Sequence, residues 1–288
     1  MWLDEPEPVI RRIAWPDGAR VAVSIALILE AWQKLPPVST ALTPVFPKEA
    51  IDRGLTDHAT LSWQLFGGRS GFSRSVSILK QHGVKGSVYC SALAAERWSD
   101  QVAAFAADGN EIVAHAYSQD HRMYFMDEAG ERAEVARCAE VIEKVTGTRP
   151  RGWSSPGGQR GDHTLTALLA EGYSYSLDFS DAEVPYVALE QDGKRLLAVP
   201  GSSVNDVNLM RNGHGTGVYV DIFCRMIDQL RAEGGTRPSM MTAIAHSTHL
   251  GRPNGGWALS KCLEYATRFD DVWLCRPQDI AGHYAAAL

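Results

Sequence analysis

The chain has 288 residues, of which 45% are hydrophobic and 22% charged, and its formal net charge is −6. This length suits one large α/β domain, and the net negative charge argues against a nucleic-acid-binding surface. No apolar run reaches the roughly 20 residues that cross a bilayer, and the first residues are acidic and proline-rich rather than a signal peptide. We therefore expect no membrane contact and a cytoplasmic location.

The hydrophobic pattern predicts strands that alternate with helices. Residues 20–29 form an almost unbroken apolar run, which is typical of a strand buried on both faces of a parallel sheet. Further strands are expected at residues 84–89, 111–114, 174–177, 196–199, 241–245 and 272–275. Helices are expected at residues 71–81, 92–108, 127–146, 165–171, 218–233 and 259–269. This alternation predicts a parallel sheet or barrel, and no linker or repeat divides residues 1–288, so a single domain is expected.

Polar side chains follow several predicted strands at their carboxyl ends. In parallel α/β barrels, catalytic side chains gather at this end of the sheet. The residues in this position are Glu30, His115, Asp178, Asn205, Asp206 and His246. We therefore expect them to converge on one site.

His115 and His246 are the predicted centre of that site, because imidazole titrates in the range that general acid–base catalysis requires. Two histidines four residues apart would chelate a metal from one helical face, but the fourth residue after His115 is Gln119. His121 would join such a site only if the chain loops back. His249 is expected either to contact substrate or to lie in an exposed loop.

Two glycine-containing segments are candidates for binding an anion through their backbone N–H groups. Residues 151–158 (RGWSSPGG) predict a rigid turn whose N–H groups would stabilise an oxyanion, although the spacing fits an ordinary turn before a helix equally well. Ser154 and Ser155 are weak nucleophile candidates because the Gly-x-Ser-x-Gly motif is absent. Residues 67–71 (GGRSG) lack the Lys-Ser/Thr ending of a P-loop, so no nucleotide site is expected there.

Several motifs, taken in order, resemble the polysaccharide deacetylase superfamily. They are residues 15–20 (WPDGAR), 68–72 (GRSGF), 109–117 (GNEIVAHAY), 147–153 (GTRPRGW), Asn205-Asp206, His246 with 251–253 (GRP), and 272–276 (VWLCR). The closer similarity is to the intracellular branch of metal-independent allantoinases and peptidoglycan deacetylase-like proteins. It spans nearly the whole chain and implies a distorted (β/α) barrel with fewer than eight strands that hydrolyses an amide bond.

The same resemblance implies a metal site from which this sequence departs. Metal-dependent members use one aspartate as a base, and a second aspartate with two histidines to hold zinc or a similar ion. Here the base position falls on Ile28, the metal aspartate on Glu30, and the two histidines on His115 and Gln119. Glu30 and His115 are thus the remaining metal-ligand candidates, and a neutral amide adds little donor strength. Metal-assisted and metal-free mechanisms carry equal weight at this point.

The sequence therefore predicts an amidohydrolase that acts on a small amide, ureide or cyclic imide. Glu30, His115 and His246 are the catalytic candidates. The substrate-binding candidates are Arg69, Trp153, Ser155, Asp178, Asn205 and Asp206. The alternatives are a metal-dependent polysaccharide or peptidoglycan N-deacetylase, and a non-catalytic binding protein on the same scaffold, which Ile28 favours. The branch also implies a homo-oligomer, by analogy a tetramer.

Overall fold

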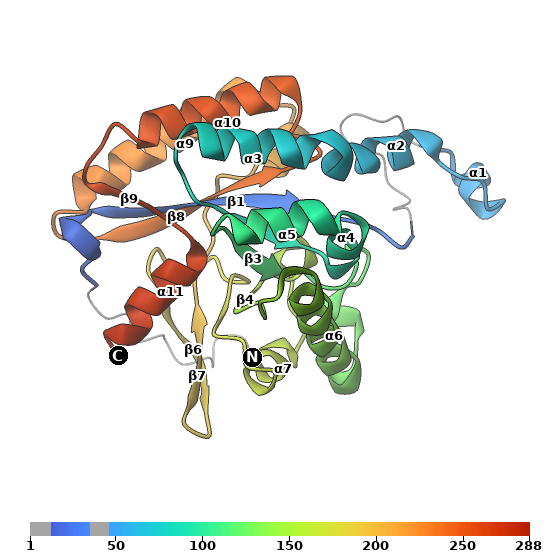
Figure 1. The fold of residues 1–288 in the computed structure, drawn as a ribbon, viewed down its shortest axis with the longest axis horizontal. Helices are drawn as coiled ribbons and strands as arrows, with labels where there is room; N and C mark the ends of the chain where they lie inside the picture. Colours follow the sequence, from blue (N-terminus) through green and yellow to red (C-terminus); the bar gives the residue numbers. More distant parts are fainter. Residues whose placement is uncertain (1–12, 35–45) are drawn as a thin grey trace.

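A curled, mostly parallel sheet forms the centre of the computed structural model, which describes residues 13–34 and 46–288 (Figure 1). Its strands are β1 (Val21–Leu29), β2 (Ser87–Cys90), β3 (Glu111–Ala114), β4 (Gly152–Trp153), β5 (Tyr175–Ser176), β6 (Tyr186–Gln191), β7 (Lys194–Ala198), β8 (Ser239–His246) and β9 (Val272–Cys275). The hydrogen-bonded order is β6-β7-β5-β4-β3-β2-β1-β8, with β9 beside β1. All pairings are parallel except that of β6 with β7.

Strand β1 organises the sheet. It pairs along one edge with β8, while β9 and β2 share the other edge. All nine of its residues are buried, because alternate side chains enter two different cores. Val23 and Leu27 belong to the larger core, whereas Ala26 and Ile28 belong to a second core inside the curl of the sheet. Burial on both faces explains the unbroken apolar run that predicted this strand.

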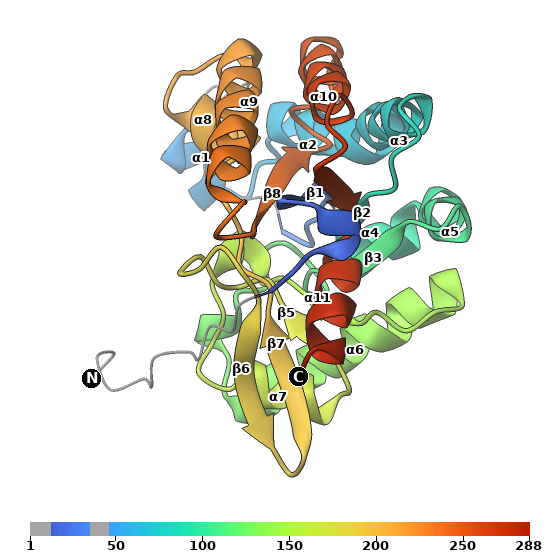
Figure 2. The ribbon, with the colours of Figure 1, turned by 90° about the vertical axis from the view of Figure 1, so that its left-hand side faces the viewer.

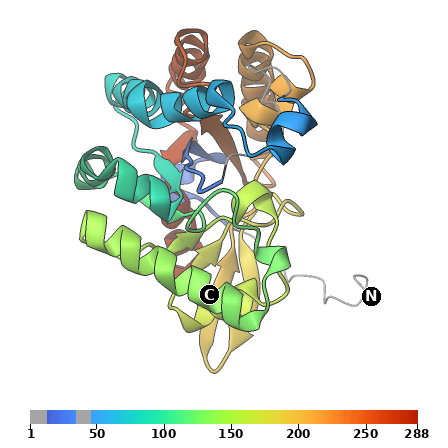
Figure 3. The same ribbon diagram turned by 90° about the vertical axis from the view of Figure 1, so that its right-hand side faces the viewer.

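Helices surround the curled sheet (Figures 2 and 3). They are α1 (Lys48–Asp52), α2 (His58–Phe66), α3 (Phe72–Gln81), α4 (Ala92–Arg97), α5 (Ser99–Ala107), α6 (Glu128–Thr146), α7 (Thr164–Ala170), α8 (Asp206–Arg211), α9 (Thr216–Glu233), α10 (Pro253–Ala266) and α11 (Pro277–Ala286). Neighbouring helices pack in series, α9 on α10 on α3 along one stretch and α5 on α6 on α7 along another. None of the helices in the described ranges is long and apolar enough to cross a membrane.

The expected distorted (β/α) barrel is confirmed, but in the described residues its sheet has nine strands rather than fewer than eight. In the part of the chain that the structure describes, the path of strands ends at β6 and β8, which do not pair, so the barrel stays open. The hairpin of β6 and β7, prominent at the lower end of Figure 2, was not predicted. Asp192 and Gly193 turn this hairpin with φ of 53° and 72°. Strand β6 was missed because its residues lack a clear apolar alternation.

Two predicted segments differ from the structure. The single helix expected over residues 92–108 is two helices, α4 and α5, because the backbone breaks at Trp98 (φ −126°, ψ 43°). The stretch between residues 30 and 70, for which no helix was predicted, contains α1 and α2, while residues 35–45 lie outside the described ranges.

Glycines allow one close approach that matters for the site. Residues Gly67–Gly71 form a π-helical turn between α2 and α3. A Cβ on Gly71 would clash with the carbonyl group of Ser247, which directly follows β8, and a Cβ on Gly68 would clash with the Trp98 ring. The GGRSG segment is therefore a packing element that lets α3 lie against the loop after β8, rather than a phosphate-binding loop.

A buried carboxyl at the amino end of β3 makes stability depend on pH. Glu111 is 4% exposed and accepts hydrogen bonds from the Tyr175 hydroxyl and from the backbone N–H of Gln278. Burial raises its pKa from 4.5 to about 7, against the effect of these two hydrogen bonds. Between those values the folded protein binds a proton that the unfolded chain has lost, so stability falls as pH rises.

We therefore expect the free energy of unfolding of the wild type to fall by about 3 kcal/mol between pH 4.5 and 7, relative to Glu111→Gln. Urea denaturation across this pH range measures the difference. The exposed Glu140 on α6 gives the matched control, since Glu140→Gln is expected to follow the wild type. Parallel curves for wild type and Glu111→Gln would contradict the prediction.

Candidate active site

A cavity of about 430 Å³ opens at the carboxyl ends of the parallel strands. Glu30 follows β1, His115 follows β3, and His246 is the last residue of β8. All three line this cavity together with Asn205, which caps α8. The structure thus brings together the three residues predicted to be catalytic.

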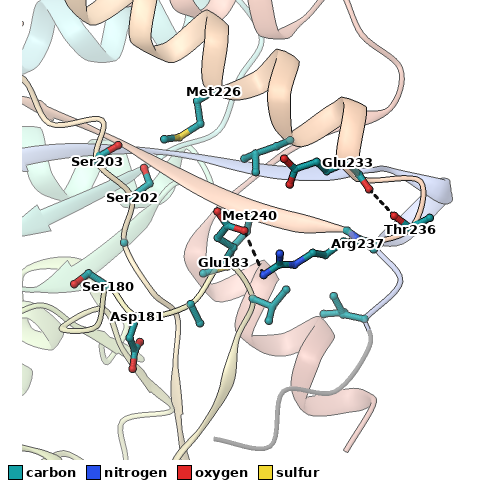
Figure 4. Close-up of a pocket in the computed structure, with 16 residues that line it drawn as sticks. Ser180, Asp181, Glu183, Ser202, Ser203, Met226, Glu233, Thr236, Arg237 and Met240 are labelled. Atoms are coloured by element: carbon teal, nitrogen blue, oxygen red, sulfur yellow. Dashed lines mark hydrogen bonds and ion pairs between the residues drawn. The ribbon is translucent and has the colours of Figure 1, made fainter. Parts of the chain in front are cut away.

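Figure 4 shows a second, larger cavity of about 830 Å³. Gly201 lines both cavities, so the two are adjacent. Its polar groups are mainly hydroxyls and carboxylates such as those of Ser202 and Asp181, and none of its lining residues in the described ranges is a histidine. The guanidinium group of Arg237, which also lines this cavity, lies 3.9 Å from the Glu183 carboxylate and is therefore paired with it. The smaller cavity therefore holds the acid–base chemistry despite its size.

Glu30 lies between the two imidazoles. Its Oε1 atom is 4.0 Å from Nε2 of His115 and 3.9 Å from Nε2 of His246, and its side chain is 8% exposed. Burial raises the pKa of the Glu30 carboxyl above its usual 4.5, although the charge of His246 opposes this effect. A carboxylate with a raised pKa, facing a cavity, has the properties of a general base.

His115 is held as a neutral hydrogen-bond acceptor. Its Nδ1 atom lies 2.7 Å from the carbonyl oxygen of Ser154, and because a carbonyl only accepts, Nδ1 carries the proton. Burial lowers the pKa of His115 to about 4, so the ring stays neutral and Nε2 presents a lone pair towards Glu30. This ring can orient a water or a substrate N–H, but it cannot donate to a developing oxyanion.

His246 has the opposite character. Its Nδ1 donates to Oδ1 of Asp206 at 2.6 Å, and its backbone N–H donates to Oδ2 of the same carboxylate at 2.8 Å. Burial alone would lower the pKa of His246, but Asp206 and Glu30 outweigh it and raise the pKa above 6.5. Nε2 of His246 therefore presents a proton towards Glu30, as a general acid requires.

Comparisons with known proteins show which proteins this chain is similar to in sequence and overall fold. Residues 65–176 match the family model described as polysaccharide deacetylase. Residues 65–176 therefore carry a polysaccharide deacetylase domain. A probable polysaccharide deacetylase from Pseudomonas aeruginosa PAO1 superposes with a TM-score of 0.87 at 27% identity, covering 96% of this chain and 95% of the other. The Puue allantoinase gives a TM-score of 0.86 at 27% identity, covering 96% and 94%.

A relative found by sequence is similar over nearly its full length. A putative polysaccharide deacetylase from Schizosaccharomyces pombe is 23% identical over 303 residues, covering 94% of this chain and 92% of the relative. Together with the family match, these similarities show that this polysaccharide deacetylase domain belongs to a hydrolase of carbon–nitrogen bonds. The alternative of a non-catalytic binding protein is thereby disfavoured.

The residues of this polysaccharide deacetylase domain do not fit a resident zinc ion. The raised pKa of His246 disfavours the neutral imidazole that a metal requires, and Gln119 supplies only a neutral amide, so Glu30 and His115 remain as strong donors. His121 is held away, since its Nδ1 and Nε2 atoms each lie 2.9 Å from oxygens of Glu134 and Gln33. Among the described residues, no three His, Cys, Asp or Glu side chains are placed to bind a metal.

The remaining predicted residues have supporting or distant positions. Ser155 donates to Asp178 through both its backbone N–H and its hydroxyl, and burial raises the pKa of Asp178 to about 6. Trp153 is fully buried and donates its indole N–H to Ser155. Arg69 is exposed in the π-helical turn and does not line the cavity.

The predicted oxyanion turn is largely occupied by its own contacts. The backbone N–H of Ser155 donates to Asp178, and that of Gly158 donates to the carbonyl oxygen of Ser155. These two N–H groups are therefore committed within the protein. The turn borders the cavity through Gly157 and Gly158, whose φ angles of 74° and 69° favour glycine.

Sequence reasoning missed several residues that line the cavity. They are Trp32, Trp63, Tyr89, Arg122, Asn208 and Arg211. Apart from Tyr89, which lies within β2, these residues come from loops and helices rather than from predicted strand ends. A search for cations and aromatic residues within a few positions of His115 and Asp206 would have found Arg122 and Arg211.

Proposed function

We propose that this protein hydrolyses a small amide, ureide or cyclic imide by direct attack of water, with Glu30 as general base and His246 as general acid. The observation that carries the proposal is the placement of the Glu30 carboxylate between the imidazoles of His115, whose pKa is lowered, and His246, whose pKa is raised. This arrangement supplies an acceptor, a base and an acid within one cavity.

The proton transfers balance. Glu30 takes a proton from water as the water oxygen bonds to the carbonyl carbon, and the lone pair on Nε2 of His115 helps to orient that water. The carbon–nitrogen bond of the tetrahedral intermediate then breaks while His246 gives its Nε2 proton to the departing nitrogen. Glu30 is left protonated and His246 neutral. Their separation of 3.9 Å allows the proton to pass back, directly or through one water, and restore both groups.

The size and lining of the cavity favour a small substrate over a polymer. A cavity of about 430 Å³ lies in the range of small-molecule sites, and Trp32 and Trp63 contribute apolar surface to it. The Trp63 ring also packs edge-on against His249 at 4.9 Å between ring centroids. The allantoinase named above is a structural relative that by its name acts on a small ureide, which supports the same substrate class.

A hydrolysis panel tests this function. Succinimide, hydantoin, allantoin, simple primary amides and N-acetylated chito-oligosaccharides are each incubated with the purified protein, before and after chelator treatment and elemental analysis. We expect turnover of small amides, ureides or imides that survives removal of metal. Turnover restricted to the oligosaccharides, or activity that is lost with the chelator and restored by zinc, would contradict the proposal.

A further inference from the structure

Two arginines of the cavity are not used by the proposed mechanism. Arg122 follows the loop after β3, and Arg211 ends α8. Arg122 acts electrostatically on Glu30 and His115, whereas Arg211 acts on Glu30, His246 and His249. Both guanidinium groups therefore line the cavity within electrostatic reach of the Glu30 carboxyl.

Neither guanidinium is neutralised by an ion pair. Within the described residues, no carboxylate forms a salt bridge with Arg122 or Arg211, whereas many other arginines pair with one, such as Arg225 with Asp221. A Cβ on Gly157 would lie 3.2 Å from a terminal nitrogen of Arg122, which places this guanidinium at the glycine turn bordering the cavity. Both arginines remain available to a ligand.

The charge balance of the cavity is consequently positive. Asp206 is committed to His246, so the Glu30 carboxylate is the one remaining negative charge among the described residues that line the cavity. Two unpaired guanidinium groups face these residues in a protein whose net charge is −6. A positive cavity in an acidic protein attracts an anion locally while the rest of the surface repels it.

We propose that Arg122 and Arg211 form an anion subsite that receives a carboxylate carried by the substrate beside its reacting amide. This inference rests on the proposed function and narrows its substrate class to acidic amides, ureides or imides. Guanidinium matches the planar carboxylate through two parallel hydrogen bonds, and such charged hydrogen bonds are stronger than neutral ones. Held in this way, the carboxylate would fix the carbonyl group relative to Glu30.

Binding of matched small ligands tests the subsite without any turnover. Oxamate, malonamate and succinamate each carry one amide and one carboxylate, and oxamide, malonamide and succinamide are their uncharged counterparts. Isothermal titration is expected to show at least about tenfold tighter binding for one or more of the carboxylates than for its diamide. Arg122→Gln and Arg211→Gln should each reduce this ratio several-fold, whereas Arg225→Gln, at an exposed position of α9 that does not line the cavity, should leave it unchanged.

Further binding measurements distinguish failure of the anion subsite from failure of the proposed function. In Glu30→Gln the preference for carboxylates is expected to persist, because it belongs to the arginines and not to the base. Equal binding of carboxylates and diamides, a preference that survives both arginine substitutions, or binding of inorganic phosphate without binding of the carboxylates would each overturn the subsite. A preference that holds in a protein which hydrolyses nothing on the panel would instead refute the proposed function and leave the subsite standing.

Discussion

Replacing Glu30 with glutamine is expected to lower kcat on the best substrate of the panel by about 10³-fold. Glutamine has the same shape as glutamate but cannot take a proton from water, so only the binding contribution of the cavity remains. Steady-state kinetics measure the loss. Because burial raises the pKa of Glu30, its charge destabilises the fold, and the variant is expected to unfold at the same or a higher temperature than the wild type.

The chain contains a well-matched control for this substitution. Glu111 is also buried, but it lies at the amino end of β3, away from the cavity. Glu111→Gln is therefore expected to keep wild-type turnover at neutral pH. Turnover of Glu30→Gln within threefold of the wild type would remove Glu30 from the role of base.

The second large loss of kcat is expected when His246, the proposed general acid, is replaced. His246→Ala is expected to lose orders of magnitude in kcat while it folds normally, since the departing nitrogen then lacks a proton donor. Asp206→Asn should lower kcat by about 10²-fold or more, because asparagine neither holds the Nδ1 proton of His246 in place nor favours the imidazolium. Asp206 acts through His246, and it is therefore a positioning residue.

The pH profile distinguishes this positioning role from a purely structural one. Glu30 must be ionised and His246 protonated, so kcat/KM should rise with pH through the raised pKa of Glu30 and fall above the raised pKa of His246. Without the Asp206 charge, the alkaline limb should move to lower pH. Asp221→Asn, at an exposed position on α9, should leave the profile unchanged. An unmoved alkaline limb in Asp206→Asn would count against the acid role of His246.

The centre of the site was predictable because its residues lie at the carboxyl ends of strands. The apolar runs before Glu30, His115 and His246 place these side chains at one edge of a parallel sheet, whatever the loops do. Trp153 shows what the pattern did not reveal. Residues 151–158 were predicted to form a turn, whereas Gly152 and Trp153 form the two-residue strand β4, and the Trp153 side chain is buried in the core.

Electrostatic roles were less predictable than positions. The sequence placed His115 at the site but left its role open, because the bond from Nδ1 to the Ser154 carbonyl depends on the fold. Arg122 and Arg211 reach the cavity from a loop and a helix end, so no periodic pattern marks them. Similarly, the pairing of Asp206 with His246 joins residues 40 positions apart, and only the neighbouring β8 and α8 bring them together.

The tight glycine packing after α2 has a consequence for engineering the enzyme. Because Gly71 lies against Ser247, larger side chains there would displace the loop next to His246 and would disturb catalysis from outside the cavity. Combinatorial libraries that aim to change the accepted substrate should therefore keep Gly68 and Gly71 fixed. Diversity belongs instead at Arg122 and Arg211, where the side chains border the cavity and carry none of the proposed proton transfers.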